Sequence, residues 1–277
     1  MIGQHPELAG LPELKLFCFD TVGELQASLP RFWKERGVVH RSPGLLRAVA
    51  QLEFGGQDAA SLGAAEHWLQ DRRTWSGPDV LDVLQQRLAP WTAVEKSPDN
   101  VVSDAGMMRM HAAYPRARYV HLTRHPVTTQ RSIEAHRIRA IGMRGRRGEP
   151  MSGIASWYDI HRRILGFVRT VPADRWLRVR AEDVLNNSDP ELKRIALWLG
   201  IRADTAAIEA MRHPECSPYS RVARVADGTL GGNDAGFLEN PIPRHAEIPS
   251  SLDVPDGWVG EPSVWPLIVN VAKHLGY

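Results

Sequence analysis

The chain has 277 residues, in which 34 lysines and arginines nearly balance 32 aspartates and glutamates, for a formal net charge of +2. So weak an overall charge argues against a nucleic-acid-binding protein. Two cysteines are too few for a disulfide framework or a metal site, and no run of about 18 apolar residues predicts a membrane span. The first residues show no signal-peptide pattern. We therefore expect a cytoplasmic protein that forms one domain without a metal.

Helical periodicity dominates residues 25–88, where apolar residues recur at intervals of three and four. The last helix of this region is "SGPDVLDVLQQRL", which opens on turn residues and places its valines and leucines on one face. Residues 91–95 then predict a short strand, and Lys96 lies just beyond its end. Residues 101–115 predict the next helix.

A second strand is predicted at residues 118–123, followed by a helix over residues 127–139. Residues 154–171 predict an amphipathic helix, residues 176–180 a further strand, and Asp189 and Pro190 open a helix that Gly200 closes. This alternation of strands and helices predicts an α/β fold with a parallel sheet flanked by helices.

Two segments are expected to be loops. Residues 139–153 are rich in glycine and arginine. Together with the end of the preceding helix they form a basic patch that could bind an anion, made of Arg131, Arg137, Arg139, Arg144, Arg146 and Arg147. Residues 212–277 are loop-rich and read as an exposed functional loop or a lid. We expect a single domain over residues 1–277, with a helical insertion at about 25–88 and the lid at about 212–277.

Lys96 and Arg124 would both lie at the carboxyl ends of strands, where open α/β sheets bind ligands. A guanidinium and a helix start opened by Pro126 can converge on one phosphate. Ser132 lies about 9 Å further along the helix, so spacing alone does not bring it to Arg124. The plain alternative is a surface arginine with a helix serine that faces a neighbour.

Lys96 and Glu13 also admit two interpretations. Lys96 is either a solvated lysine or a cation that stabilises charge on a transferred group. Glu13 is either an exposed carboxylate before a helix or a general base for an acceptor hydroxyl. Taken singly, neither residue decides between its two interpretations.

Five segments together resemble the sulfotransferases that use 3′-phosphoadenosine 5′-phosphosulfate (PAPS). In chain order they are "HPELAGLPELKLF", "VEKSPDN", "YPRARYVHLTRHPVTTQRS", "WLRVRAEDVLNNSDPELKRIALWLGI" and "GGNDAGFLENP". The resemblance implies a P-loop-NTPase-like parallel sheet, with Arg124 and Ser132 holding the 3′-phosphate of PAPS. Ala181 stands where that family often has a tyrosine near the cofactor, and the last segment resembles a C-terminal loop that closes over the cofactor.

The branch that contains the protein-tyrosine sulfotransferases and related bacterial sulfotransferases is the most similar. It implies that Glu13 is the catalytic base and that Lys96 stabilises charge on the bridging oxygen or the sulfonate. Lys15 falls near a basic position of the same motif. The implied reaction is transfer of a sulfuryl group to a hydroxyl or amine of a small-molecule, carbohydrate or peptide acceptor, with no metal.

One part of the family pattern is missing. The 5′-phosphosulfate loop, Gly-x-x-Arg-Ser-Gly-Thr, does not occur in the sequence, so we expect the first strand of the sheet and this loop to be lacking. The favoured explanation is a natural protein that begins upstream. The alternatives are a degenerate, non-catalytic homologue that binds nucleotide or a partner, and compensation by the arginines at 144–147. A P-loop phosphotransferase would need a Walker lysine, which is also absent.

The acceptor is not identified by the sequence, and neither is the oligomeric state. Five tryptophans are candidates for an apolar or carbohydrate-stacking pocket, although scattered tryptophans more often pack in cores and on surfaces. They are Trp33, Trp68, Trp75, Trp91 and Trp157.

Overall fold

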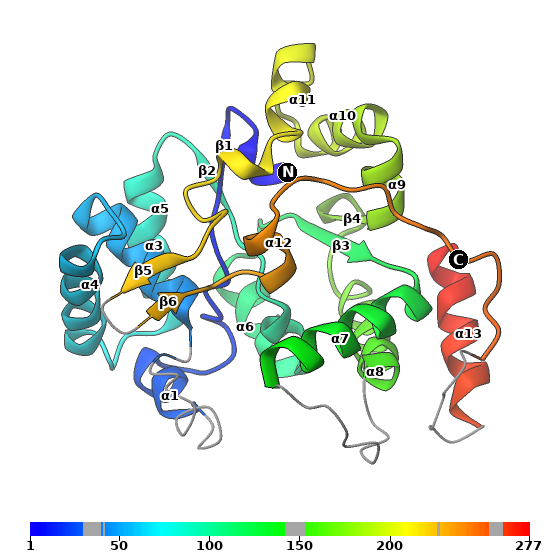
Figure 1. Ribbon diagram of the computed structural model, residues 1–277, viewed down its shortest axis with the longest axis horizontal. Helices are drawn as coiled ribbons and strands as arrows, with labels where there is room; N and C mark the ends of the chain where they lie inside the picture. Colours follow the sequence, from blue (N-terminus) through cyan, green and yellow to red (C-terminus); the bar gives the residue numbers. More distant parts are fainter. Residues whose placement is uncertain (30–39, 41, 142–152, 226–227, 255–262) are drawn as a thin grey trace. The chain divides into compact units, whose positions relative to one another are not determined.

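The computed structural model describes residues 1–29, 40, 42–141, 153–225, 228–254 and 263–277. The chain divides into two compact units, the first made of Met1–Ala117 with Leu192–Pro243 and the second of Arg118–Glu191 with Arg244–Tyr277. Each unit combines helices with short parallel strands, so the predicted α/β class is confirmed (Figure 1). Trp33 and the arginines at 144, 146 and 147 lie outside the described residues.

The first unit contains a parallel pair of strands, β1 (Leu8–Gly10) and β2 (Thr92–Val94), with Leu8 opposite Thr92 and Gly10 opposite Val94. The sequence predicts β2 but not β1. Two of the three residues of β1, Ala9 and Gly10, are poor strand formers, and its pairing with β2 is a contact between distant parts of the chain. The pairing places the residues after Gly10 beside those after Val94.

Helices surround these strands in the first unit. The described part of the predicted helical region at 25–88 contains three helices of 12 or 13 residues, α3, α4 and α5. Two of them start at serine caps, Ser42 for α3 and Ser76 for α5, whose hydroxyls accept a backbone N–H. In chain order the helices and 3₁₀ turns of this unit are η1 (Ile2–Gln4), α1 (Val22–Ala27), α3 (Pro43–Phe54), α4 (Ala59–Asp71), α5 (Gly77–Leu88), η2 (Pro98–Val101), α6 (Asp104–Ala113), α11 (Thr205–Met211), η4 (Pro214–Cys216) and α12 (Ala235–Glu239).

An antiparallel hairpin of β5 (Ala223–Val225) and β6 (Gly228–Leu230) is fastened to α3 by Arg47. The Arg47 side chain is 1% exposed, and its guanidinium donates to the carbonyls of Gly231 and Arg221 at 2.6 Å each. Buried donors of this kind require partners, so the contacts fix the segment beside β6 against α3. That segment is the one that resembles the family's C-terminal loop.

The second unit contains β3 (Tyr119–Thr123) and β4 (Trp176–Arg180), a parallel pair in which Thr123 lies opposite Arg180. Both strands occur where the sequence predicts them. The other elements of this unit are α7 (Pro126–Ile141), α8 (Gly153–Phe167), η3 (Ala173–Arg175), α9 (Ala181–Asn186) and α13 (Val264–Leu275), and α10 (Ser188–Leu199) crosses from this unit into the first.

The core of the second unit lies between α7, α8 and α13 and is built on Val127, Trp157, Trp265 and Ile268. Next to Trp157, the buried rings of His121 and His161 share a hydrogen bond of 2.9 Å. Burial lowers the pKa of His121 to about 3 and that of His161 to about 4. Both imidazoles are therefore neutral at physiological pH and act as packing groups.

Two features differ from the sequence prediction. In the described residues the strands form separate parallel pairs, β1 with β2 and β3 with β4, and not one continuous sheet. In the region expected to be loop-rich, α13 is a helix of 12 residues. Its proline, Pro266, lies in the first turn, where the missing N–H leaves no bond unmade, and Gly276 closes it with φ of 95°.

Candidate functional site

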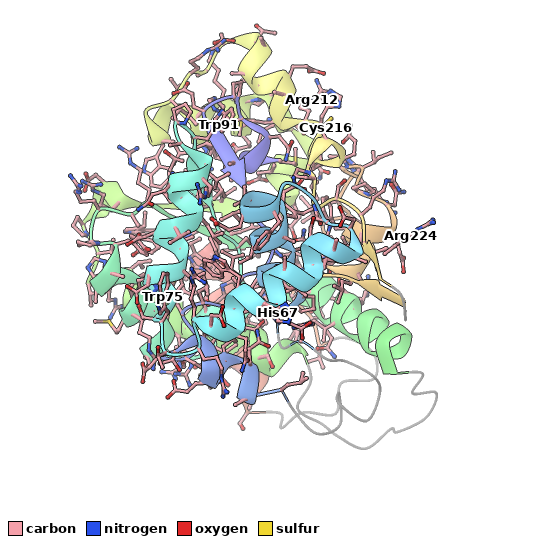
Figure 2. The ribbon with its side chains drawn as sticks, turned by 90° about the vertical axis from the view of Figure 1, so that its left-hand side faces the viewer. His67, Trp75, Trp91, Arg212, Cys216 and Arg224 are labelled. Atoms are coloured by element: carbon pink, nitrogen blue, oxygen red, sulfur yellow. The ribbon has the colours of Figure 1, made fainter. Side chains whose placement is uncertain are left out.

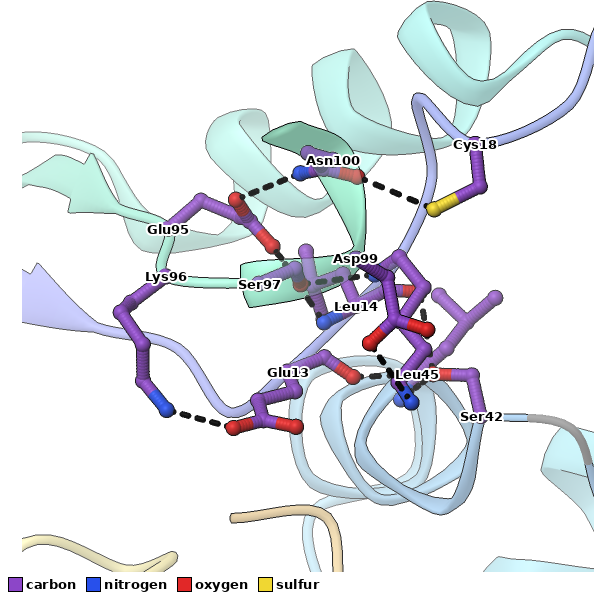
Figure 3. Close-up of polar contacts among 11 residues, drawn as sticks. Glu13, Leu14, Cys18, Ser42, Leu45, Glu95, Lys96, Ser97, Asp99 and Asn100 are labelled. Atoms are coloured by element: carbon purple, nitrogen blue, oxygen red, sulfur yellow. Dashed lines mark hydrogen bonds and ion pairs between the residues drawn. The ribbon is translucent and has the colours of Figure 1, made fainter. Parts of the chain in front are cut away.

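Glu13 and Lys96 lie at the carboxyl-terminal edge of the β1–β2 pair and contact each other. The Lys96 ammonium is 2.5 Å from the Glu13 carboxylate, although the two residues are 83 positions apart (Figure 3). The Glu13 side chain is 17% exposed and that of Lys96 is 54% exposed, so the pair has one sheltered and one solvated member. Glu13 follows a strand and does not precede a helix, contrary to the plain interpretation of the sequence.

The backbone of Glu13 is held on both sides by its own unit. Its N–H donates to the carbonyl of Gly232 at 2.8 Å, and its carbonyl accepts from the Ser42 hydroxyl at 2.9 Å. Gly44 in the first turn of α3 lies so close that an added Cβ would be 2.3 Å from the Glu13 carbonyl oxygen. Only glycine allows α3 to approach the Glu13 backbone this closely.

Replacing Gly44 with alanine is expected to destabilise the protein by about 1–3 kcal/mol, because the new methyl group must displace a fixed backbone carbonyl. Urea unfolding measures this change. Gly63→Ala is the matched control, because a Cβ at Gly63 in α4 meets nothing within 4 Å. The control is expected to gain about 0.5–1 kcal/mol from helix propensity alone. Equal stabilities of the two variants would contradict the close approach.

Lys15 takes a backbone conformation that L-residues rarely adopt, with φ of 60°. Its N–H donates to the Ser97 hydroxyl at 2.8 Å, and its ammonium pairs with Asp99 at 3.0 Å. A left-handed conformation costs a residue other than glycine about 1–2 kcal/mol, and these two bonds offset that cost. Lys15 therefore pairs with Asp99, and a role in binding the donor stays a prediction.

Glu95 is the residue of this site that the sequence interpretation missed. Its carboxylate accepts bonds from the Leu14 N–H at 3.4 Å, from the Asn100 amide at 3.1 Å and from the Ser97 hydroxyl (Figure 3). The residue is half-buried, and three donors surround its carboxylate. Burial raises the pKa of Glu95 to about 7, against the opposing effect of the bonds from Ser97 and Leu14.

The free energy of unfolding is expected to fall as pH rises from about 4.5 to about 7, because native Glu95 keeps a proton that the unfolded chain has lost. Each unit of pKa difference corresponds to about 1.4 kcal/mol. Urea unfolding of the wild type and of Glu95→Gln at several pH values measures this contribution, which the neutral amide removes. The same pH dependence in both proteins would show that the pKa of Glu95 is not raised.

The second predicted pair, Arg124 and Ser132, lies in the second unit. Arg124 directly follows β3 and is exposed, and its Nε donates to the Thr128 hydroxyl at 3.3 Å. Ser132 is exposed in α7. Among the described residues no direct contact joins the two side chains, in agreement with their spacing. The structure therefore places Arg124 at the strand end, and the binding of one phosphate by Arg124 and Ser132 stays a prediction.

A buried carboxylate shapes the backbone around Arg124. Glu182 is 1% exposed and accepts from the His125 N–H at 2.7 Å and from the Tyr277 hydroxyl at 3.1 Å. The Tyr277 hydroxyl also lies 3.0 Å from the Thr123 hydroxyl. The Arg124 carbonyl accepts from the indole N–H of Trp157 at 2.9 Å. The turn between β3 and α7 is thus fixed at three successive residues.

The remaining tryptophans are packing residues in the structure. Arg72 lies over the rings of Trp68 and Trp75, at 4.0 and 4.9 Å from their centroids. Trp91 is 47% exposed and donates its indole N–H to the Pro6 carbonyl at 2.9 Å; Figure 2 labels Trp75 and Trp91. Their use as an acceptor pocket stays a prediction.

No cluster of three or more His, Cys, Asp or Glu side chains is placed to hold a metal ion in the described part of the chain. No helix formed by the same residues is both long and apolar enough to cross a membrane.

Comparisons with known proteins identify the family. A model described as "Sulfotransferase family" matches residues 1–205, whereas no curated protein matches the sequence. The fold is similar to the sulfotransferase domain from the curacin biosynthetic pathway, with a TM-score of 0.70 and 20% identity over 100% of this chain and 91% of that one. It is also similar to the sulfotransferase domain of the Synechococcus PCC 7002 olefin synthase, with a TM-score of 0.68 and 25% identity over 100% of this chain and 88% of that one. The chain belongs to the sulfotransferase family.

Proposed function

We propose that this protein transfers a sulfuryl group from PAPS to a hydroxyl or amine of a small-molecule, carbohydrate or peptide acceptor. The observation that carries the proposal is the contact between Glu13 and Lys96 at the carboxyl ends of two paired strands, in a chain of the sulfotransferase family. A carboxylate can take the proton of an acceptor hydroxyl or amine, and an ammonium can offset negative charge that develops on a leaving group. We propose the cytoplasm as the compartment.

In the proposed reaction the acceptor oxygen or nitrogen attacks sulfur while the Glu13 carboxylate takes its proton. The bond between sulfur and the bridging oxygen breaks, and adenosine 3′,5′-bisphosphate leaves with the bonding electrons. Lys96 donates to the bridging oxygen and offsets its developing charge. Because the Lys96 side chain is exposed, it can move from Glu13 to the bridging oxygen of PAPS, whereas the more sheltered Glu13 stays in place.

We assign binding of the donor's 3′-phosphate to Arg124 and Ser132. Support comes from the position of Arg124, between the end of β3 and the first turn of α7, where its charge adds to the positive end of the dipole of a helix of 16 residues. The turn is held by buried bonds to Glu182 and Trp157, so the guanidinium is presented from a fixed backbone.

Release of adenosine 3′,5′-bisphosphate from PAPS in the presence of hydroxyl and amine acceptors tests the proposal. Calorimetric titration with the bisphosphate alone separates binding from turnover. Transfer that depends on an acceptor supports the enzyme. Binding without transfer to any acceptor favours the non-catalytic homologue instead, and absence of both overturns the assignment of PAPS.

A further inference from the structure

The segments that carry Glu13 and Lys96 continue side by side after their strands end. The last backbone bond between them runs from the Leu11 N–H to the Val94 carbonyl at 2.9 Å. Beyond it, bonds that involve side chains connect the two segments. In order along the chain the pairs are Glu13 with Lys96, Leu14 with Glu95, Lys15 with Ser97 and with Asp99, and Cys18 with Asn100.

Glu95 is the centre of these connections. It receives one bond from the segment of Glu13, through the Leu14 N–H, and two from its own segment, through Ser97 and Asn100 (Figure 3). Ser97 in turn accepts the Lys15 N–H, so the route from Lys15 to Glu95 passes through one hydroxyl. Glu95 thereby fixes the backbone on both sides of the Glu13–Lys96 contact.

The chemistry of the partners selects a carboxylate. The Leu14 N–H only donates, and the Asn100 amide nitrogen also donates, because its oxygen accepts from the Cys18 thiol at 3.4 Å. The Ser97 hydroxyl accepts from Lys15 and has its proton left for Glu95. In its ionised form the Glu95 carboxylate meets all three donors with its two oxygens, whereas glutamine would turn one N–H toward a donor.

We infer that Glu95 is a positioning residue that holds Glu13 and Lys96 in register for transfer. This inference rests on the proposed function. Glu95 is not itself the base, because both of its oxygens are occupied by donors of its own unit, whereas the Glu13 carboxylate meets the solvated end of Lys96. The charged groups that face Glu95 are Lys96 and Glu13.

A double-mutant cycle between Glu95→Ala and Glu13→Gln tests the inference. Glu95→Ala is expected to lower kcat about tenfold and leave KM for PAPS unchanged, because misplacing the base weakens only the chemical step. In the Glu13→Gln background the same substitution is expected to cause no further loss. A full additional tenfold loss in that background, or a wild-type kcat in Glu95→Ala, overturns the inference.

Ser97→Ala, which removes the bridging hydroxyl, provides a second test if Glu95→Ala fails to fold, and is expected to show the same lack of additivity. Glu66→Gln is the control, since Glu66 is an exposed glutamate of the same unit. Amide hydrogen exchange gives a readout that needs no turnover. Faster amide exchange at Leu14 and Lys15 in Glu95→Ala would show that Glu95 holds the backbone beside Glu13, and it would do so even if the wild type transferred no sulfuryl group. Unchanged exchange would contradict the inference.

Discussion

Replacing Glu13 with glutamine is expected to lower kcat for sulfuryl transfer by about 10²–10⁴-fold, the usual contribution of a general base. Glutamine has nearly the same shape and retains an acceptor oxygen for Lys96, but it cannot take the proton of the acceptor. The Glu13 backbone bonds to Gly232 and Ser42 are not altered, so folding and donor binding should persist. Initial rates at saturating PAPS and calorimetric titration of adenosine 3′,5′-bisphosphate measure the two effects.

Glu66→Gln serves as the matched control, because it makes the same chemical change at an exposed glutamate of α4. It should keep wild-type kcat and wild-type nucleotide affinity. If Glu13→Gln turned over at the wild-type rate, Glu13 would not be the base. Loss of nucleotide binding in Glu13→Gln would instead indicate a structural role.

The predicted strands at 118–123 and 176–180 appear as β3 and β4 because each has a compact apolar segment between turn residues. The helix capped by Ser76 was predictable for a similar reason, since Ser76 and Asp79 form a capping box that is local in sequence. β1 was not predictable, because Ala9 and Gly10 are poor strand formers and its partner is more than 80 positions away. The Glu13–Lys96 contact depends on that pairing.

The candidate site was predictable only through its resemblance to a family. Nothing in the spacing of Glu13 and Lys96 places them together, and the resemblance supplied the pair that the structure joins at 2.5 Å. Glu95 and Glu182 were missed because burial decides their roles, and burial of a charged residue depends on distant partners such as Leu14 and Tyr277. For Glu182, its position two residues after the end of β4 was the available signal.

Replacing Arg124 with alanine is expected to weaken binding of adenosine 3′,5′-bisphosphate by about 1.5–3 kcal/mol, the range for a hydrogen bond to a charged group. This corresponds to a loss of affinity of roughly 10- to 150-fold. Arg124 contacts only Thr128 through its side chain among the described residues, and that contact is exposed, so the substitution should leave stability nearly unchanged.

The 3′-phosphate itself distinguishes a specific contact from a general loss of charge. Adenosine 5′-monophosphate lacks that phosphate, so its weaker affinity should be the same for wild type and Arg124→Ala, and only the bisphosphate should lose binding. Arg212→Ala, at the exposed end of α11 (Figure 2), removes the same charge from the first unit instead of the second and should bind both nucleotides as the wild type does. Because charge-assisted contacts weaken in salt, the difference between the two nucleotides should shrink as ionic strength rises. Equal losses of affinity for both nucleotides would place Arg124 outside the 3′-phosphate site. Arg124 would then act on nucleotide binding only through the overall electrostatic potential of the protein.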